Sequence, residues 1–313
     1  MGNIVKLSLV TFVSGVEVLT DDFLSLANNL QQFYNIEVIA FVDQANNIYT
    51  SQYIKQFVSP FTTKYNRIQQ LLIETKMDYC LLIDNDITPD SNEIIKFLQE
   101  SFASEADLAW GQIGVRPSSL MTKMIKIDKM LSHSIIRPLL WRLGLGASIP
   151  GQVFLIKPRS FRKKLPKSDT IFDDLTIGIY AKENNFSVYF KRSILGLEKP
   201  KDNIISLLNQ RIRWANGFSQ VVNINRGNYS SLNLVLIHGA AYHFLLLLFW
   251  LLIFGLSFIS IKYSMILWLM LISILTFGQV SLIAASLAYT IVFPIIHVVW
   301  LGVAVPRCFK WVG

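Results

Sequence analysis

The stretch YCLLIDND, residues 79–86, decides the fold class of this chain. Its first five residues, Tyr79 to Ile83, are apolar or aromatic and predict a strand buried on both faces of a parallel sheet. Asp84 and Asp86 follow, so two carboxylates stand at the carboxyl end of that strand, where α/β sheets bind their ligands. Two such oxygen donors suit one shared Mg²⁺ or Mn²⁺ ion. A plain loop, followed by a helix capped at Asp90, is the alternative.

Strand-type and helix-type runs alternate on both sides of this stretch. The run Glu37 to Val42 predicts another buried parallel strand, and residues 4–13 predict the first strand of the sheet. Such alternation is typical of an α/β domain with a mostly parallel sheet. The remaining strands are expected at residues 108–115, 152–156 and 187–190, and the helices at 23–34, 63–75 and 89–101.

Three further acids are candidate site residues. Asp43 ends the second predicted strand, where a carboxylate can accept hydrogen bonds from a nucleotide base or ribose, although turn residues are equally common there. Asp173 and Asp174 precede a predicted helix at 175–181. Two acids at a helix start are stabilised by the helix dipole, and one of them can also act as a general base.

A polar motif, QRIRW at residues 210–214, lies on a helix predicted for residues 203–218. Gln210, Arg213 and Trp214 are spaced i, i+3 and i+4, so they share one face of that helix. An amide, a fixed charge and a flat aromatic ring suit a diphosphate and a sugar. The alternative is an amphipathic helix packed under the domain, with Arg213 paired to an acid.

The charge of the chain is unevenly distributed. Of its 313 residues 52% are hydrophobic and 16% are charged, which excludes a disordered tail and disfavours an ordinary soluble enzyme. Between residues 232 and 306 the only charged residue is Lys262, whereas residues 119–168 carry 11 Lys and Arg against one acid, Asp128. A basic block beside an apolar segment favours contact with anionic lipid headgroups over binding to nucleic acid.

These patterns predict a water-facing domain over residues 1–231 and a transmembrane region over residues 232–313. One span is expected at 234–259, and residues 263–305 have room for one or two more. Residues 119–146 predict an amphipathic helix in the membrane interface, or one packed on the domain core. Because no secretory signal precedes the first strand, we expect an integral membrane protein, in the plasma membrane of a bacterium, with residues 1–231 in the cytosol.

Taken in order, the motifs resemble those of the membrane-bound inverting glycosyltransferases of family 2. That group includes cellulose, chitin and hyaluronan synthases and ceramide glucosyltransferase. Its pattern is an Asp at a strand end, D-x-D, an acidic pair, Q-x-x-R-W and then transmembrane helices. The matching residues, within a resemblance that covers residues 4–305, are Asp43, Asp84, Asp86, Asp173, Asp174, Gln210, Arg213 and Trp214.

The resemblance implies a GT-A fold and a role for each matching residue. Asp43 would contact the nucleotide base, and Asp84 with Asp86 would hold the nucleotide and a Mg²⁺ or Mn²⁺ ion. Asp174 would be the general base, beside Asp173 in the donor site. The residues that would bind the diphosphate and line the acceptor site are Gln210, Arg213 and Trp214.

The implied reaction moves a sugar from a nucleotide diphosphate sugar, expected to be UDP-linked, with inversion. Polysaccharide synthases of this group have spans on both sides of the catalytic domain, and here the spans follow it only. A membrane lipid is therefore the favoured acceptor. A processive polysaccharide synthase and an inactive membrane-anchored binding protein are the alternatives.

Overall fold

The computed structural model describes residues 5–14, 19–43, 54–59, 62–162, 165 and 169–309. The chain forms two compact units. Unit 1 comprises Met1–Gly114 and Ala147–Lys199, and unit 2 comprises Val115–Gly146 and Pro200–Gly313. Residue 4, at the start of the predicted first strand, and residues 163, 164 and 166–168 of the basic block lie outside the described residues. The sequence predicts a water-facing domain that ends at residue 231 and a transmembrane region after it. The two compact units do not test that boundary, which stays a prediction.

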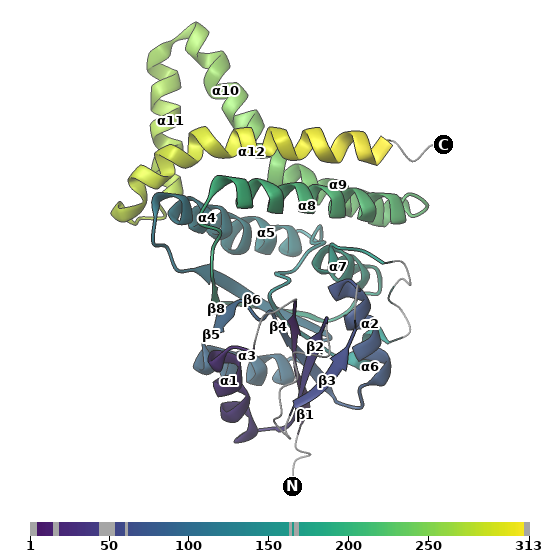
Figure 1. Cartoon of the computed structure of the whole chain (residues 1–313). Helices are drawn as coiled ribbons and strands as arrows, with labels where there is room; N and C mark the ends of the chain where they lie inside the picture. Colours follow the sequence, from purple (N-terminus) through teal and green to yellow (C-terminus); the bar gives the residue numbers. More distant parts are fainter. Residues whose placement is uncertain are drawn as a thin grey trace. The chain divides into compact units, whose positions relative to one another are not determined.

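An eight-stranded sheet, in the order β3-β2-β1-β4-β7-β6-β8-β5 among the described residues, forms the centre of unit 1 (Figure 1). Its strands include all of those predicted, and β3 and β5 in addition. The strands are β1 (Lys6–Val13), β2 (Asn35–Val42), β3 (Ile54–Val58), β4 (Tyr79–Ile83), β5 (Ile87–Pro89), β6 (Leu108–Val115), β7 (Val153–Ile156) and β8 (Val188–Glu198).

The sheet is mixed rather than mostly parallel. Strands β3, β2, β1 and β4 are parallel neighbours, as the sequence predicts for β2 and β4. Strand β7 then pairs antiparallel with β4, where Ile83 lies opposite Val153, and also with β6. Strand β5 is antiparallel to β8. Hydrophobic periodicity marks a buried strand but carries no information on its direction, so the antiparallel half was not predictable from it.

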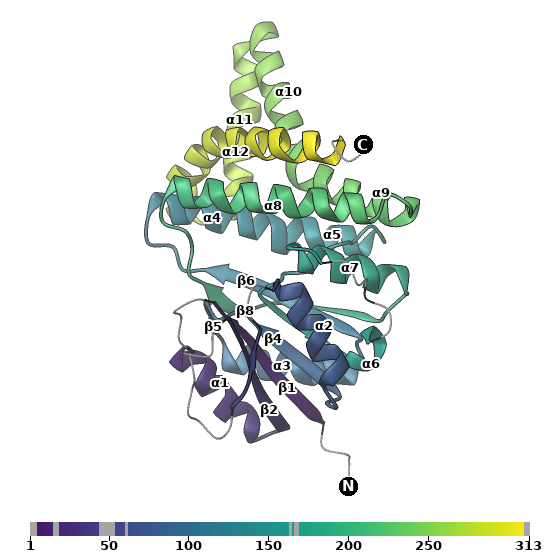
Figure 2. The ribbon, with the colours of Figure 1, turned by 45° about the vertical axis from the view of Figure 1, so that its right-hand side comes forward.

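Helices cover both faces of this sheet (Figures 1 and 2). Phe23 and Leu26 of α1 join Phe97 of α3 in one buried cluster with Leu9 and Leu81 of the sheet. Helices α2 and α6 lie on the opposite face. The helices of unit 1 are α1 (Asp21–Gln31), α2 (Lys64–Glu74), α3 (Ser91–Ala103), α6 (Pro158–Phe161) and α7 (Asp173–Glu183).

Side-chain caps fix where the helices begin. The Thr63 side chain accepts a hydrogen bond from the Asn66 amide at the start of α2. The Asp90 side chain accepts from the amides of Asn92 and Glu93, which confirms the predicted cap of α3. Strand β4 ends at Ile83, directly before Asp84, and α2 begins at Lys64. A charged residue therefore stands at the end of β4 and at the start of α2.

Unit 2 consists of helices among its described residues. Residues 120–142 stay helical, and a π-helical turn at Leu131–Ile136 precedes Pro138. Figures 1 and 2 both show α12 running beside α8. The α-helices are α4 (Leu120–Met130), α5 (Arg137–Arg142), α8 (Ile204–Ile224), α9 (Tyr229–Gly239), α10 (Leu245–Ile259), α11 (Ile261–Leu275) and α12 (Ile283–Phe309), with a second π-helical turn at Ala240–Phe244 and a 3₁₀ turn at Val280–Leu282.

Two helical stretches of unit 2 are long and apolar enough to cross a membrane. They are Tyr229–Ile259, which joins α9 to α10, and Val280–Phe309, which contains α12. Only 6% of the most apolar window of the first is buried, against 50% for the second. Helix α11 is apolar but shorter.

Candidate functional site

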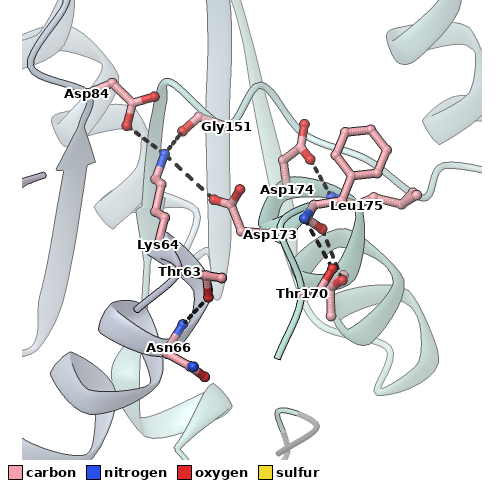
Figure 3. Close-up of polar contacts among 11 residues, drawn as sticks. Thr63, Lys64, Asn66, Asp84, Gly151, Thr170, Asp173, Asp174 and Leu175 are labelled. Carbon is pink, nitrogen blue, oxygen red and sulfur yellow. Dashed lines mark hydrogen bonds and ion pairs between the residues drawn. The ribbon is translucent and has the colours of Figure 1, made fainter. Parts of the chain in front are cut away.

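A lysine links two of the predicted acids in unit 1 (Figure 3). The Lys64 Nζ donates to Asp84 Oδ1 at 2.6 Å and lies 3.6 Å from Asp173 Oδ2. It also donates to the Gly151 carbonyl oxygen at 2.5 Å. We call Lys64, Asp84 and Asp173 the Lys64 cluster. It joins the end of β4, the first turn of α2 and the first turn of α7.

Backbone pairing explains why these groups meet. Strand β7 extends the antiparallel ladder by one step, because the Asp84 amide donates to the Gln152 carbonyl oxygen at 2.9 Å. That bond holds Asp84 next to Gly151, whose carbonyl oxygen receives Lys64. The Lys64 Nζ also lies 5.2 Å from the ring centroid of Phe12 and 5.8 Å from that of Phe154.

The Lys64 cluster carries more negative charge than positive. Burial raises the pKa of Asp84 to about 6, and the charges of Asp86 and Asp173 add to this rise, while Lys64 opposes it. Burial alone would lower the pKa of Lys64, but the surrounding carboxylates of Asp84, Asp173 and Asp174 raise it above its ordinary value. The lysine is therefore charged at neutral pH.

Asp43, which follows the end of β2, is bound by an arginine of α2, the helix that also carries Lys64. Arg67 of α2 forms an ion pair with Asp43 and donates to the Ser59 carbonyl oxygen at 3.0 Å. Lys64 and Arg67 are three residues apart, so both point from one face of α2. Sequence reasoning missed both cations. Their i, i+3 spacing at the start of a predicted crossover helix was the available signal.

Asp174 lies beside the cluster, next to Asp173 in the first turn of α7. One of its oxygens accepts a hydrogen bond from the Leu175 amide at 2.8 Å. A Cβ on Gly151 would come within 3.1 Å of the Asp174 Cβ, so a side chain there would require Asp174 to shift by a few tenths of an ångström. The structure thus brings Asp84, Asp173 and Asp174 together, as the resemblance to family 2 implies.

The donor set of Asp84 and Asp86 fits a hard divalent cation. Asp86 is exposed and lies close enough to influence the charge state of Asp84. No group of three or more metal-binding side chains occurs among the described residues. Two carboxylates with open positions are the arrangement by which Mg²⁺ is commonly bound together with substrate phosphates.

The predicted residues of unit 2 lie on α8. Arg213 is exposed, and Gln210 and Trp214 are half-buried. The buried cation of this helix is Arg211, which forms an ion pair of 2.5 Å with Asp128 of α4, so it is Arg211 rather than Arg213 that pairs with an acid. The Trp214 ring lies 4.3 Å from the Arg211 guanidinium.

A second side chain completes this ion pair. The Tyr289 hydroxyl of α12 donates to Asp128 at 3.2 Å. We call Arg211, Asp128 and Tyr289 the Arg211 cluster. Sequence reasoning missed it, although Arg211 falls in the apolar stripe formed by Leu207, Ala215 and Phe218 of α8.

The fold resembles that of solved glycosyltransferases. A mannosyltransferase from Pyrobaculum calidifontis, solved with GDP-Man and Mn²⁺, shares 11% identity with a TM-score of 0.54, over 97% of this chain and 87% of that one. Glucosyl-3-phosphoglycerate synthase from Mycobacterium tuberculosis, solved with Mn²⁺, UDP and phosphoglyceric acid, shares 15% identity with a TM-score of 0.46, over 68% and 77%. At 11% identity the likeness to the mannosyltransferase concerns the fold alone, and it confirms the predicted GT-A type.

The family assignment rests on the sequence itself. No curated protein sequence matches this chain. The family model described as "Glycosyl transferase family group 2" matches residues 79–300, which begin at β4 and run through both acidic motifs, the QRIRW motif and most of α12. The chain therefore belongs to glycosyl transferase family group 2.

Proposed function

We propose that this protein is a membrane-bound, inverting glycosyltransferase that moves a hexose from a nucleotide diphosphate sugar to a lipid acceptor. The observation that carries this proposal is the Lys64 cluster with Asp174 beside it. It combines surplus carboxylates with a charged lysine, at the sheet edge where nucleotides bind in α/β folds. This is a suitable environment for a diphosphate, a cation and a general base.

The proposed reaction is a single displacement. A hydroxyl of the acceptor attacks the anomeric carbon of the donor from the face opposite the diphosphate. The new glycosidic bond forms while the bond to the diphosphate oxygen breaks, which inverts the anomeric centre. Asp174 takes the hydroxyl proton as general base. The Leu175 amide, 2.8 Å from one Asp174 oxygen, fixes the orientation of the carboxylate.

The donor would be held by acids of unit 1 and by the arginine of the QRIRW motif. Asp43 would contact the base, and Asp84 with Asp173 would position the nucleotide. On α8, the Arg213 guanidinium would bind the diphosphate, while Gln210 and Trp214 would line the acceptor site. A Mg²⁺ or Mn²⁺ ion held by Asp84 and Asp86 would offset the negative charge that develops on the leaving diphosphate.

Apolar helices and basic residues support the choice of a lipid acceptor. The stretch Tyr229–Ile259 is long enough to span a bilayer, and its most apolar part is almost entirely unburied. Helices α4 and α5 contribute Lys123, Lys129 and Arg142, and such charges suit anionic headgroups. A lipid-linked hydroxyl would reach the enzyme at that interface.

The test is transfer by purified protein in mixed lipid and detergent, with radiolabelled UDP- and GDP-linked hexoses and Mn²⁺. We expect a single lipid-linked sugar from one donor. The Asp174→Asn variant should lose about 10²–10⁴-fold in rate, the usual contribution of a general base. Asp90→Asn is the matched control, because asparagine caps a helix as well as aspartate does.

The possible outcomes separate the alternatives. A long polymer as product would show a processive polysaccharide synthase instead of transfer to a lipid acceptor. If the wild-type protein transfers no sugar from any donor, the proposal that it is a glycosyltransferase is contradicted. Full activity of Asp174→Asn would remove that residue from the role of base, and full activity after chelation would remove the metal.

A further inference from the structure

The apolar segment of unit 2 that follows α8 begins and ends at neighbouring positions. Arg226, in the turn between α8 and α9, donates a hydrogen bond to the carbonyl oxygen of Cys308 in the last turn of α12. Lys126 of α4 donates to Gln279, in the connection between α11 and α12, at 3.0 Å. The segment therefore leaves the end of α8, comes back beside α4 and ends beside its own beginning.

Helix α12 lies along α8 rather than pointing away from it. The two helices run in the same direction and touch at successive levels (Figures 1 and 2). Phe293 lies 6.0 Å from the Arg211 guanidinium, and the rings of Trp300 and Phe218 are 5.0 Å apart. Because α8 carries charged and amide side chains along its length, it needs water or headgroups beside it. A helix bound to it at this many levels cannot cross the hydrocarbon core.

The other face of α12 is apolar and exposed. Its exposed side chains are spaced by three or four residues, so they form one stripe opposite the face that packs on α8 and α4. A helix with one packed face and one exposed apolar face is suited to lie in the membrane interface, about 5–10 Å into the boundary of the acyl chains. The stripe includes Leu287, Ile291, Ile295, Val298 and Val305.

Helices α10 and α11 form a hairpin that leaves this layer (Figure 1). The Ser264 hydroxyl of α11 donates to the Ile253 carbonyl oxygen of α10 at 2.9 Å, which ties the two arms together near their tip. Phe258 and Ile259 at the tip are 77% and 81% exposed. Each arm has 15 residues, which corresponds to about 22 Å of helix.

The base of the hairpin is fixed to the interfacial layer. The Tyr242 ring faces Arg137 of α5, and the His243 ring stacks on Trp300 of α12 at 3.6 Å. An arm of about 22 Å beyond a layer immersed by about 5–10 Å reaches about 30 Å, the thickness of the hydrocarbon core. The tip carries Lys262 and Tyr263, two residue types that anchor helices at a headgroup region.

We propose that unit 2 crosses the bilayer twice, through α10 and α11, and that α12 lies flat in the interface on the side of α8. The lipid-facing surface is then the hairpin together with the stripe of α12. Lys262 reaches the far headgroups, while Lys126, Arg226 and Arg307 remain on the near side, as the positive-inside rule requires. This topology rests on the proposed membrane attachment, but not on the chemistry of the reaction.

Single-cysteine labelling tests this topology. Cys80 is buried and is replaced by alanine, which leaves Cys308 of α12 as the natural reporter. Three proteins are compared: Cys80→Ala alone, and two proteins that also carry Cys308→Ala with either Ser260→Cys at the hairpin tip or Ser104→Cys after α3. Each is treated with a membrane-impermeant maleimide in right-side-out and in inside-out vesicles, and transfer activity or melting temperature verifies folding.

We expect Cys308 to react from the same side as Ser104→Cys, and Ser260→Cys to react from the opposite side only. Reaction of Cys308 from the side opposite to Ser104→Cys would overturn the flat placement of α12. A tip cysteine that reacts only after detergent is added would overturn the two crossings. Release of the whole protein from vesicles by alkaline carbonate would instead contradict the membrane attachment on which the topology rests.

Discussion

The Lys64 cluster of unit 1 and the Arg211 cluster of unit 2 use the same chemistry and differ in charge balance. In the first, one cation meets two carboxylates, and Asp174 and Asp86 add further negative charge. In the second, one arginine meets one carboxylate whose other oxygen is bound by a tyrosine hydroxyl. The first cluster has capacity for another cation, whereas in the second one positive charge balances one negative charge. Charge surplus thus distinguishes a candidate site from a structural ion pair.

The largest effect is expected when Lys64 is replaced by methionine. The carboxylates of Asp84 and Asp173 then lose their cation, which should lower the free energy of unfolding by about 3–5 kcal/mol without metal. Saturating Mn²⁺ should restore much of that loss, because a dication at Asp84 offsets the same charges. Melting temperatures with and without Mn²⁺ measure this. Equal melting temperatures in both conditions would contradict the capacity for a cation.

The replacement of Arg211 by methionine is expected to cost somewhat less, about 3 kcal/mol, because the Tyr289 hydroxyl still binds Asp128. Mn²⁺ should give no recovery here. The double variant Arg211→Met with Asp128→Asn is the control, since it removes both charges and should be more stable than Arg211→Met alone. If the double variant is the less stable one, the cluster is not a simple ion pair.

Tyr289→Phe sharpens the same comparison at the level of a single hydrogen bond. It removes only the hydroxyl that binds Asp128, so we expect a loss of about 1–2 kcal/mol in the free energy of unfolding. Denaturant unfolding in detergent measures the loss. Phe218→Leu, whose ring packs on Trp300 of α12, is a control for ring packing, and its effect should persist in an Arg211→Met background, whereas that of Tyr289→Phe should change.

The smallest effect is expected at Glu100, whose side chain is about half exposed to solvent. Hydrogen bonds from Lys191 and Tyr189 lower the pKa of Glu100, so its stabilisation is present above the ordinary glutamate range and is lost as the pH falls through the lowered value. Glu100→Gln should therefore be slightly less stable than wild type at neutral pH and equal to it in strong acid. A difference that grows as the pH falls would reverse the assigned sign.

Much of the fold was predictable from local patterns. The strand at Tyr79–Ile83 and the cap at Asp90 depend on residues close in sequence, and both were predicted correctly. The proximity of Asp84 to Asp173 was implied only by the resemblance, because local patterns do not say where the helix that begins at Asp173 lies in the fold. The direction of β7 did not follow, since it depends on the path of the chain between 115 and 152.

The residues that the sequence analysis missed depend on tertiary contacts. Lys64 and Arg67 look like ordinary helix surface in the sequence, and only the tertiary fold brings acids to them. Arg211 was passed over for Arg213 because the spacing of the motif does not say which face of α8 is buried. Partners more than a few residues apart determine each of these contacts. The roles assigned to Asp43, Asp86, Gln210, Arg213 and Trp214 stay predictions.

The contact between Tyr289 and Asp128 also has a consequence for the order in which the chain is made. The two residues are 161 positions apart, so α4 leaves the ribosome long before the helix that covers it exists. Contacts of such sequence separation form slowly and late. Completion of unit 2 must therefore follow translation of α12. We expect a chain that stops before Tyr289 to expose the side of α4 that α12 covers, and therefore to be more sensitive to proteolysis.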